Sequence, residues 1–137
     1  NPTYSFANAP QIDILIISGG SGTRKQMTDK ETLNWINEIH KETTFTLSIC
    51  SGARLLGVLN LLNGKPYCTH KGVYEHLKKI VSNGIPKPQK RFVQSSEKIF
   101  TSGGISAGID LSFHILELLH GKTIVEETAD YMEYELR

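Results

Sequence analysis

The sequence predicts an α/β fold in which a mostly parallel sheet has helices on both faces, a three-layer sandwich. Three observations predict it. Strand and helix patterns alternate along the 137 residues. Residues 12–17 are a nearly continuous aliphatic run, which is typical of a strand buried on both faces. Loops rich in glycine or serine follow three apolar strands, at 18–22, 50–52 and 102–108. Ligands of such folds bind beyond the carboxyl ends of the strands, so these loops mark the expected site.

The first half of the chain predicts two neighbouring strands joined by a helix. The strand 12–17 leads into the loop 18–22, and residues 28–31 predict a capping box at the start of a helix. The second strand, 44–49, follows this helix. We expect the two strands to be adjacent and parallel, which places the loops that follow them at one edge of the sheet.

The second half of the chain completes the predicted sandwich. Its hairpin is predicted because a polar turn separates two apolar segments. The expected elements are a helix after residue 52, a short strand at 67–69, a helix at 73–81, a hairpin of 91–94 with 99–102, an apolar helix opened by 103–108, and an amphipathic helix within 124–136.

Length and charge narrow the class of protein. We expect a single domain, 1–137, with one core. The formal net charge of +1 gives no reason to expect nucleic acid or a membrane surface as a partner. The two cysteines, in unlike contexts and without a signal peptide, fit a reducing cytoplasm.

Cys50 is the candidate nucleophile. It lies where the strand 44–49 ends and a Cys-Ser-Gly turn opens a helix, the arrangement of a nucleophile elbow. The positive end of a helix favours the thiolate form of a cysteine placed there. The alternative is that Cys50 is an inert, buried thiol, as free cysteines often are. Cys68, in a short strand-like segment, is expected to be such a filler.

The glycine-rich loops do not match the known nucleotide-binding patterns. No Gly-Lys-Ser/Thr ending is present, and residues 19–22 lack a dinucleotide fingerprint. No cluster of ligands at metal spacing appears either. We therefore expect neither a cofactor nor a metal.

Four segments together resemble the ThiJ/PfpI superfamily, which has a flavodoxin-like, class I glutamine amidotransferase-like fold. They are residues 17–22, 49–53, 69–70 and 101–110, in matching order and spacing, and the resemblance covers nearly the whole chain. Within the superfamily the chain looks most like the isonitrile hydratase branch and the amidase-like domains of AraC-type regulators.

The resemblance implies roles for the residues of the three loops. Cys50 would be the nucleophile, and the backbone N–H groups of Gly20 and Ser51 would form the oxyanion hole. Gly19 and Gly104 would line the same substrate-binding region. Superfamily members also place an acidic residue from the first strand against the thiol. No strand matching it precedes residue 12, so we expect the domain to be incomplete at its N-terminus.

His70 follows Cys50 by twenty residues, where several superfamily members carry a histidine near the thiol. Two interpretations stay open: His70 is the base that holds Cys50 as thiolate, or it only forms a hydrogen bond within its loop. The hydratase branch usually has a tryptophan next, whereas this chain has Lys71, so we expect a different pocket wall and substrate.

Two functions fit these observations. The first is a cysteine-dependent hydratase or hydrolase of a small molecule, by isonitrile hydration or amide hydrolysis. The second is a non-catalytic redox or ligand sensor, such as the amidase-like domain of an AraC-type regulator. The resemblance also implies a homodimer.

Overall fold

The computed structural model describes residues 2–136, and its main sheet has four strands in the order β1-β2-β6-β5. The strands are β1 (Ile14–Ile17), β2 (Phe45–Ser48), β6 (Ile99–Ser102) and β5 (Phe92–Gln94). The first three are parallel, and β5 is antiparallel to β6. The predicted adjacency of the first two strands and the predicted hairpin are both confirmed.

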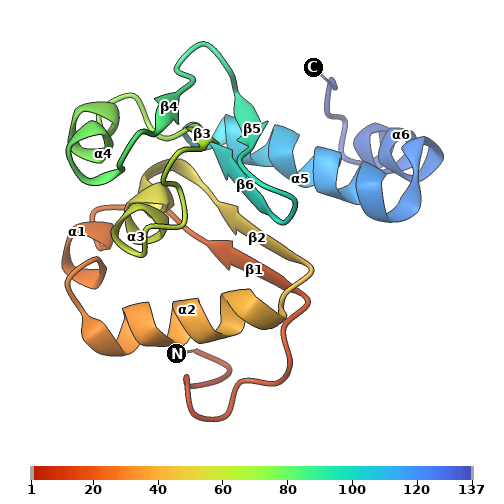
Figure 1. Ribbon diagram of the computed structural model, residues 1–137. Helices are drawn as coiled ribbons and strands as arrows, with labels where there is room; N and C mark the ends of the chain where they lie inside the picture. The colour runs from red at the N-terminus through yellow and green to blue at the C-terminus, as the bar shows by residue number, and fades with distance from the viewer. Residues whose placement is uncertain (1, 137) are drawn as a thin grey trace.

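Helices cover both faces of this sheet, as predicted for a three-layer sandwich (Figure 1). On one face, α2 (Lys30–Glu42) and α3 (Ala53–Val58) pack against β1 through a core that includes Leu15, Ile36 and Leu56. On the other face, α5 (Ser106–His120) packs against Leu47 and Phe100. The alternating side chains of the strands therefore serve two separate cores.

The smaller elements lie around the main sheet. Strands β3 (Pro66–Tyr67) and β4 (Ile85–Pro86) form a separate two-stranded parallel sheet, so the strand expected at 67–69 begins and ends earlier. The remaining elements are α1 (Thr23–Gln26), a 3₁₀ turn at Cys50–Gly52, α4 (Tyr74–Ile80) and α6 (Lys122–Tyr131). Figure 1 shows α6 beyond the end of the sheet, where it packs on α5.

The predicted capping box at 28–31 is wrong, because the N-cap of α2 is Asp29. Its carboxylate accepts the backbone N–H of Thr32 at 3.0 Å. Thr28 is engaged instead in closing the turn after α1, where its hydroxyl donates to the carbonyl of Lys25 at 2.9 Å. The Thr28 hydroxyl thus serves the turn after α1, a short helix that was not predicted from the sequence, and does not cap α2.

The N-terminal segment is attached to α2 by the single tryptophan of the chain. The ring of Trp35 stacks on Phe6, with centroids 4.7 Å apart. The indole N–H also donates to the carbonyl of Phe6 at 3.1 Å. Both contacts involve Phe6, so this pair holds the first part of the segment on α2, while Ile12, nearer β1, packs against the core.

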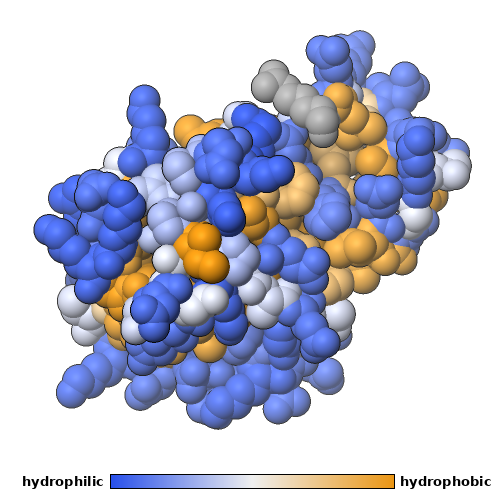
Figure 2. Space-filling model, turned by 45° about the horizontal axis from the view of Figure 1, so that its top comes forward, coloured by the Kyte–Doolittle hydropathy of each residue, from blue (hydrophilic) through white to orange (hydrophobic). Residues whose placement is uncertain are grey.

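The outer surface differs between the two ends of the molecule. Figure 2 shows apolar side chains gathered over α5 and α6, while the rest of that face is mainly hydrophilic. The exposed apolar residues of these helices include Ile109, Leu118, Leu119, Ile124 and Tyr131. Within residues 2–136, no helix has the length and apolar character needed to cross a membrane.

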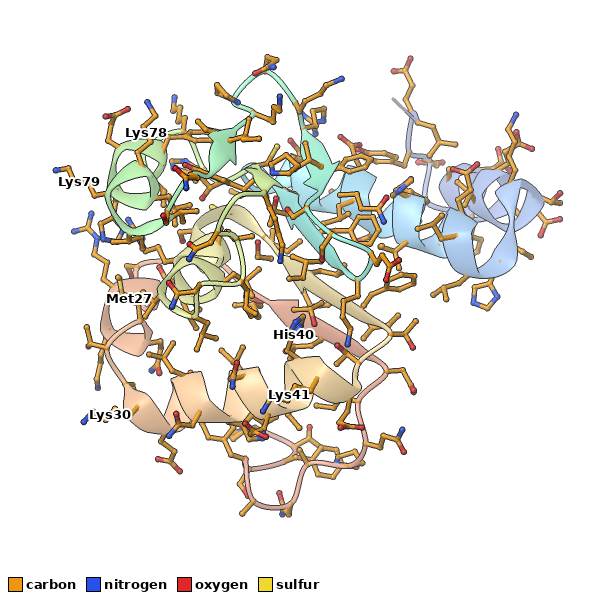
Figure 3. All side chains as sticks on the ribbon, viewed as in Figure 1. Met27, Lys30, His40, Lys41, Lys78 and Lys79 are labelled. Atoms are coloured by element: carbon orange, nitrogen blue, oxygen red, sulfur yellow. The ribbon has the colours of Figure 1, made fainter. Side chains whose placement is uncertain are left out.

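His40 links α2 to the centre of the sheet. Its side chain points from α2 toward the sheet (Figure 3), where Nδ1 lies 2.9 Å from the hydroxyl of Thr46. Thr46 also lies within hydrogen-bond distance of Thr43, at 2.8 Å. Burial lowers the pKa of His40, and the positive charges of Lys98 and Lys65 lower it further. The fold therefore favours the neutral imidazole.

We expect this histidine to make the fold less stable in mild acid. Above pH 6.5, its ordinary pKa, His40 is neutral in both states and contributes no pH dependence. Below that value the unfolded chain binds the proton first, so the free energy of unfolding falls as the pH falls. In His40→Gln, the decrease between about pH 7.5 and about pH 5.5 should be smaller in urea titrations. Parallel pH profiles for the two proteins would contradict this.

Candidate active site

Cys50 has a strained backbone that two neighbouring loops hold in place. It follows β2, which lies between β1 and β6, and its φ of 58° is in the left-handed region. Its N–H donates to the carbonyl of Gly103 at 3.1 Å, and its carbonyl accepts the hydroxyl of Thr69 at 2.8 Å. Such a conformation costs about 1–3 kcal/mol and persists only where neighbouring structure fixes it. The loops after β6 and β3 supply those contacts.

Two glycines let the backbone segments around Cys50 approach closely. A Cβ on Gly19 would lie 2.7 Å from the Cβ of Cys50, and one on Gly52 would lie 2.3 Å from the carbonyl oxygen of Ile17. Both distances are shorter than atoms tolerate. Gly19, predicted to line the substrate region, lies against Cys50, where only a glycine fits.

The two predicted oxyanion donors lie side by side, but one is already occupied. The N–H of Gly20 donates to Oγ of Ser51 at 2.9 Å, and that hydroxyl lies 3.1 Å from the carbonyl of Gly20. This reciprocal contact joins the loop after β1 to the elbow. For the Gly20 N–H to bind an oxyanion, the Ser51 side chain has to rotate away.

His70 forms the loop hydrogen bond that was one of its two interpretations. Its Nδ1 accepts the N–H of Gly72 at 3.1 Å. A backbone N–H only donates, so Nδ1 carries no proton and neutral His70 carries its proton on Nε2. Gly104 lies against the other side of the ring, since a Cβ there would be 3.1 Å from Cδ2 of His70. Neutral His70 is thus arranged to donate a hydrogen bond from Nε2.

An open pocket of about 580 Å³ brings most of the predicted site residues together. Cys50, Ser51, Gly20 and His70 all line it, although no hydrogen bond within residues 2–136 joins Cys50 Sγ to His70. Gly104 lines a neighbouring pocket on the far side of His70. The other lining residues are Ser21, Arg24, Arg54, Gly72 and Val73.

Two arginines of this pocket, Arg24 and Arg54, were not predicted from the sequence. Arg54 is only 7% exposed, and its Nη1 donates to the hydroxyl of Thr23 at 3.0 Å. Burial lowers the pKa of Arg54, as does the charge of Arg24, whereas Cys50 raises it. A signal was present: Arg54 interrupts the otherwise apolar helix α3 directly after the elbow.

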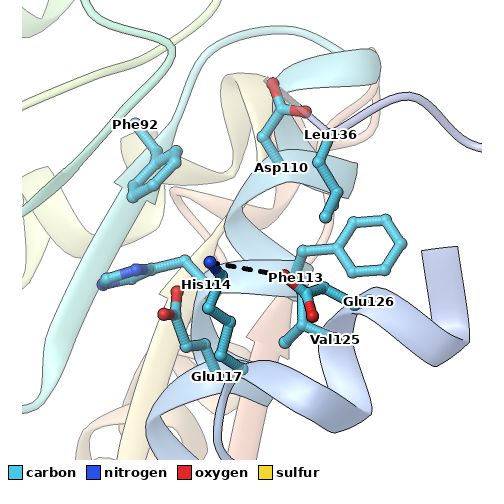
Figure 4. Close-up of a pocket in the computed structure, with 9 residues that line it drawn as sticks. Phe92, Asp110, Phe113, His114, Glu117, Val125, Glu126 and Leu136 are labelled. Atoms are coloured by element: carbon cyan, nitrogen blue, oxygen red, sulfur yellow. Dashed lines mark ion pairs between the residues drawn. The ribbon is translucent and has the colours of Figure 1, made fainter.

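A second, smaller pocket of about 180 Å³ lies away from Cys50, among β5, α5 and α6 (Figure 4). Its Asp110 pairs with Arg91 and accepts the hydroxyl of Tyr134 at 2.6 Å. These contacts tie the C-terminal segment to α5 and β5. Within residues 2–136, no group of three or more His, Cys, Asp or Glu side chains is placed to hold a metal ion.

Cys68 is a buried thiol in a setting unlike that of Cys50. It is 0% exposed, and its Sγ lies 3.3 Å from the carbonyl of Lys87. Burial raises the pKa of Cys68 to about 11. Its thiolate fraction near neutral pH is therefore roughly a hundredfold or more below that of an ordinary thiol with a pKa near 8.5.

We expect iodoacetamide at about pH 7.5 to alkylate Cys50 while Cys68 stays a thiol, because only Cys50 is accessible from a pocket. Cys68 should react after the protein is unfolded in urea. Peptide mass spectrometry of timed samples measures both. Alkylation of Cys68 in the folded protein, ahead of Cys50, would contradict this assignment.

Comparison with known proteins places the chain in a family. The model of the DJ-1/PfpI family matches residues 1–118. An isonitrile hydratase from Pseudomonas putida is 31% identical over 133 residues, which are 97% of this chain and 57% of that protein. The HTH-type transcriptional regulator GbdR from Pseudomonas aeruginosa is 25% identical over 136 residues. Those residues are 98% of this chain and 36% of the regulator, so the chain spans about half or less of these relatives.

Solved structures share the fold. A ThiJ/PfpI family protein from Pseudomonas syringae superposes with a TM-score of 0.88 at 28% identity, over 99% of this chain and 55% of that one. DJ-1beta from Drosophila melanogaster superposes with a TM-score of 0.75 at 19% identity, over 90% of this chain and 64% of that one. The second likeness concerns the fold alone.

Proposed function

This chain belongs to the DJ-1/PfpI family, and from that premise we propose that it is a cysteine-dependent hydratase or hydrolase of a small molecule. The observation that carries the proposal is the strained Cys50, whose φ of 58° and accessible pocket suit a nucleophile. Isonitrile hydration is the first reaction to test, because the hydratase relative is 31% identical over 97% of the chain.

In the proposed reaction the thiolate of Cys50 acts first as the nucleophile and then as the leaving group. Cys50 Sγ adds to the terminal carbon of R–NC, and this carbon takes a proton to give a thioimidate, R–N=CH–S–Cys. Water then adds to the same carbon. The C–S bond breaks, the thiolate returns, and R–NH–CHO leaves, so the overall change is the addition of one water molecule.

The surrounding groups would serve these steps in different ways. His70 is proposed to orient the reacting groups through a hydrogen bond from its Nε2–H, because its Nδ1 accepts from Gly72. The proton that the carbon takes is the one that the Cys50 thiol gives up on forming the thiolate, relayed by water. The Ser51 N–H, and the Gly20 N–H once the Ser51 hydroxyl turns away, would stabilise negative charge on oxygen in amide hydrolysis or during collapse of the water adduct.

A second candidate function is a ligand or redox sensor. Its support is the match to the regulator GbdR, which covers 98% of this chain. In this case Cys50 would bind or sense a small molecule in the same pocket without turnover. Both candidates take a small molecule as partner, and a homodimer and a cytoplasmic location stay predictions for either.

The deciding experiment measures product. The protein is incubated with cyclohexyl isocyanide and benzyl isocyanide, and the corresponding N-substituted formamides are quantified by liquid chromatography with mass spectrometry. Multiple turnovers per Cys50 support the hydratase. The sensor is supported instead if iodoacetamide alkylates Cys50 rapidly but the protein forms no formamide from either isocyanide and hydrolyses none of a set of primary amides.

A further inference from the structure

Two hydrogen bonds hold the peptide planes on either side of the Cys50 Cα. The N–H of Cys50, in the preceding plane, donates to the carbonyl of Gly103 at 3.1 Å. Its carbonyl, in the following plane, accepts the hydroxyl of Thr69 at 2.8 Å. Peptide planes are rigid, so holding both of them fixes φ and ψ and with them the direction of the Cα–Cβ bond. The left-handed φ of 58° is thus held from outside the elbow.

The contact from Thr69 is the one that a side chain makes. Gly103 offers a backbone carbonyl, which any residue at that position would supply, whereas the donor at position 69 has to be a hydroxyl. Valine has the shape of threonine but carries a methyl group where the donor was. At 2.8 Å from the Cys50 carbonyl oxygen a methyl group would be too close, so that peptide plane would have to turn.

Thr69 is itself held by the surrounding structure. It is buried, and its N–H donates to the hydroxyl of Tyr74 at 3.3 Å. The N–H of the preceding residue, Cys68, donates to the hydroxyl of Thr101 at 2.8 Å. Thr101 belongs to β6, the strand next to β2 in the main sheet. The Thr69 hydroxyl therefore meets the Cys50 carbonyl from a support that is anchored in the sheet.

The same hydrogen bond joins two parts of the pocket. His70 directly follows Thr69 and lines the pocket together with Cys50. Within residues 2–136 no hydrogen bond joins the two side chains directly. The Thr69 hydroxyl thus ties the loop that carries His70 to the backbone of the elbow.

We propose that Thr69 is a positioning residue, whose hydroxyl holds the elbow in the conformation that directs the Cys50 thiol into the pocket beside His70. The inference rests on the proposed function, in which Cys50 is the reactive thiol. Thr69 does not line the pocket of Cys50, so it acts through the nucleophile and not on the substrate.

Thr69→Val and Thr69→Ser test this role, because only serine keeps the donor. We expect Thr69→Val to lower the rate constant for alkylation of Cys50 by iodoacetamide about fivefold or more, since the thiol is no longer held toward the pocket. In turnover, kcat should fall about tenfold or more while KM changes by less than about twofold. Thr69→Ser should bring both rate constants back to within about threefold of the parent values.

Thr43→Val is the matched control for the loss of a buried hydroxyl. Thr43 is also buried, and its hydroxyl also donates to a backbone carbonyl, that of His40 at 3.0 Å. It precedes β2, whereas Cys50 follows this strand. The substitution should lower the midpoint of urea unfolding but leave alkylation of Cys50 within about twofold. If Thr69 only stabilised the fold, Thr69→Val would behave in the same way.

Tyr74→Phe gives a second test that does not depend on the folding of Thr69→Val. It removes the acceptor of the Thr69 N–H but keeps the ring, which stacks on Tyr67. Alkylation of Cys50 should slow about twofold or more, because the buried N–H loses its partner and the segment shifts. Tyr67→Phe makes the same change in the other ring of the stack and should leave the rate unchanged.

The results distinguish failure of the positioning role from failure of the proposed function. Alkylation at the parent rate or faster in folded Thr69→Val overturns the positioning role and leaves the nucleophile intact, and so does a loss that Thr69→Ser fails to restore. If the expected order of alkylation rates holds but the parent protein turns over neither isocyanides nor amides, the positioning role stands and the enzyme proposal fails. If Cys50 of the parent protein reacts no faster than Cys68, both fail.

Discussion

Cys50→Ser is expected to abolish turnover, lowering kcat by about 10³-fold or more, while the protein stays folded. A neutral hydroxyl is a much poorer nucleophile than a thiolate. Serine is close to cysteine in size and keeps the backbone contacts to Gly103 and Thr69. Formamide production measures the loss, and circular dichroism with urea unfolding measures the fold.

Cys68→Ser is the matched control, because it makes the same change at the other cysteine. The new hydroxyl would lie beside the carbonyls of Lys87 and Lys90, which accept from the thiol at 3.3 and 3.5 Å. Burying it there is tolerable because an acceptor is at hand. Activity should stay within about twofold, since Cys68 is absent from the pocket. If the Cys50→Ser protein kept undiminished turnover, the assignment of Cys50 as the nucleophile would be refuted.

Gly52→Ala is expected to be the most damaging substitution to the fold among those made near the site. Its Cβ would lie 2.3 Å from the carbonyl oxygen of Ile17 and 3.0 Å from that of Ser18, and both are backbone atoms that no side-chain rotation can move. The end of β1 or the start of α3 must shift. We expect the free energy of unfolding to fall by about 3 kcal/mol or more, at the upper end of overpacking costs.

Gly22→Ala provides the comparison for this effect. Gly22 has ordinary helical angles, φ −56° and ψ −26°, and an added Cβ meets nothing within 4 Å. Its stability should be unchanged or raised by about 0.4–1 kcal/mol, because alanine restricts the unfolded chain. Equal urea midpoints for Gly52→Ala and the parent protein would show that β1 and α3 can separate without cost.

The strands and the elbow were predictable because local patterns determine them. The aliphatic run at 12–17 and the Cys-Ser-Gly turn at 50–52 specify a buried strand and a tight turn from neighbouring residues alone. Parallel strand order then placed Gly20 and Cys50 at one edge, and the pocket contains both. Family resemblance added the roles, which geometry alone does not assign.

The remaining features depend on contacts between distant parts of the chain. The two-residue pairing of Pro66–Tyr67 with Ile85–Pro86 is too short to produce a periodic signal. The tautomer of His70 follows from a turn at Gly72 that no motif specifies. Arg54 is buried because α1 and α4 cover α3. Sequence periodicity could mark it as an unusual charge, but could not place it beside the thiol.

The stacking of Trp35 on Phe6 makes tryptophan fluorescence a local signal. The indole is the only one in the chain, it lies on α2, and it does not line the pocket of Cys50. Its emission therefore responds to the docking of the N-terminal segment on α2, as well as to the core against which Trp35 also packs. Ligand titrations followed by intrinsic fluorescence would miss events at the thiol, and early changes during denaturation would report release of that segment instead of global melting.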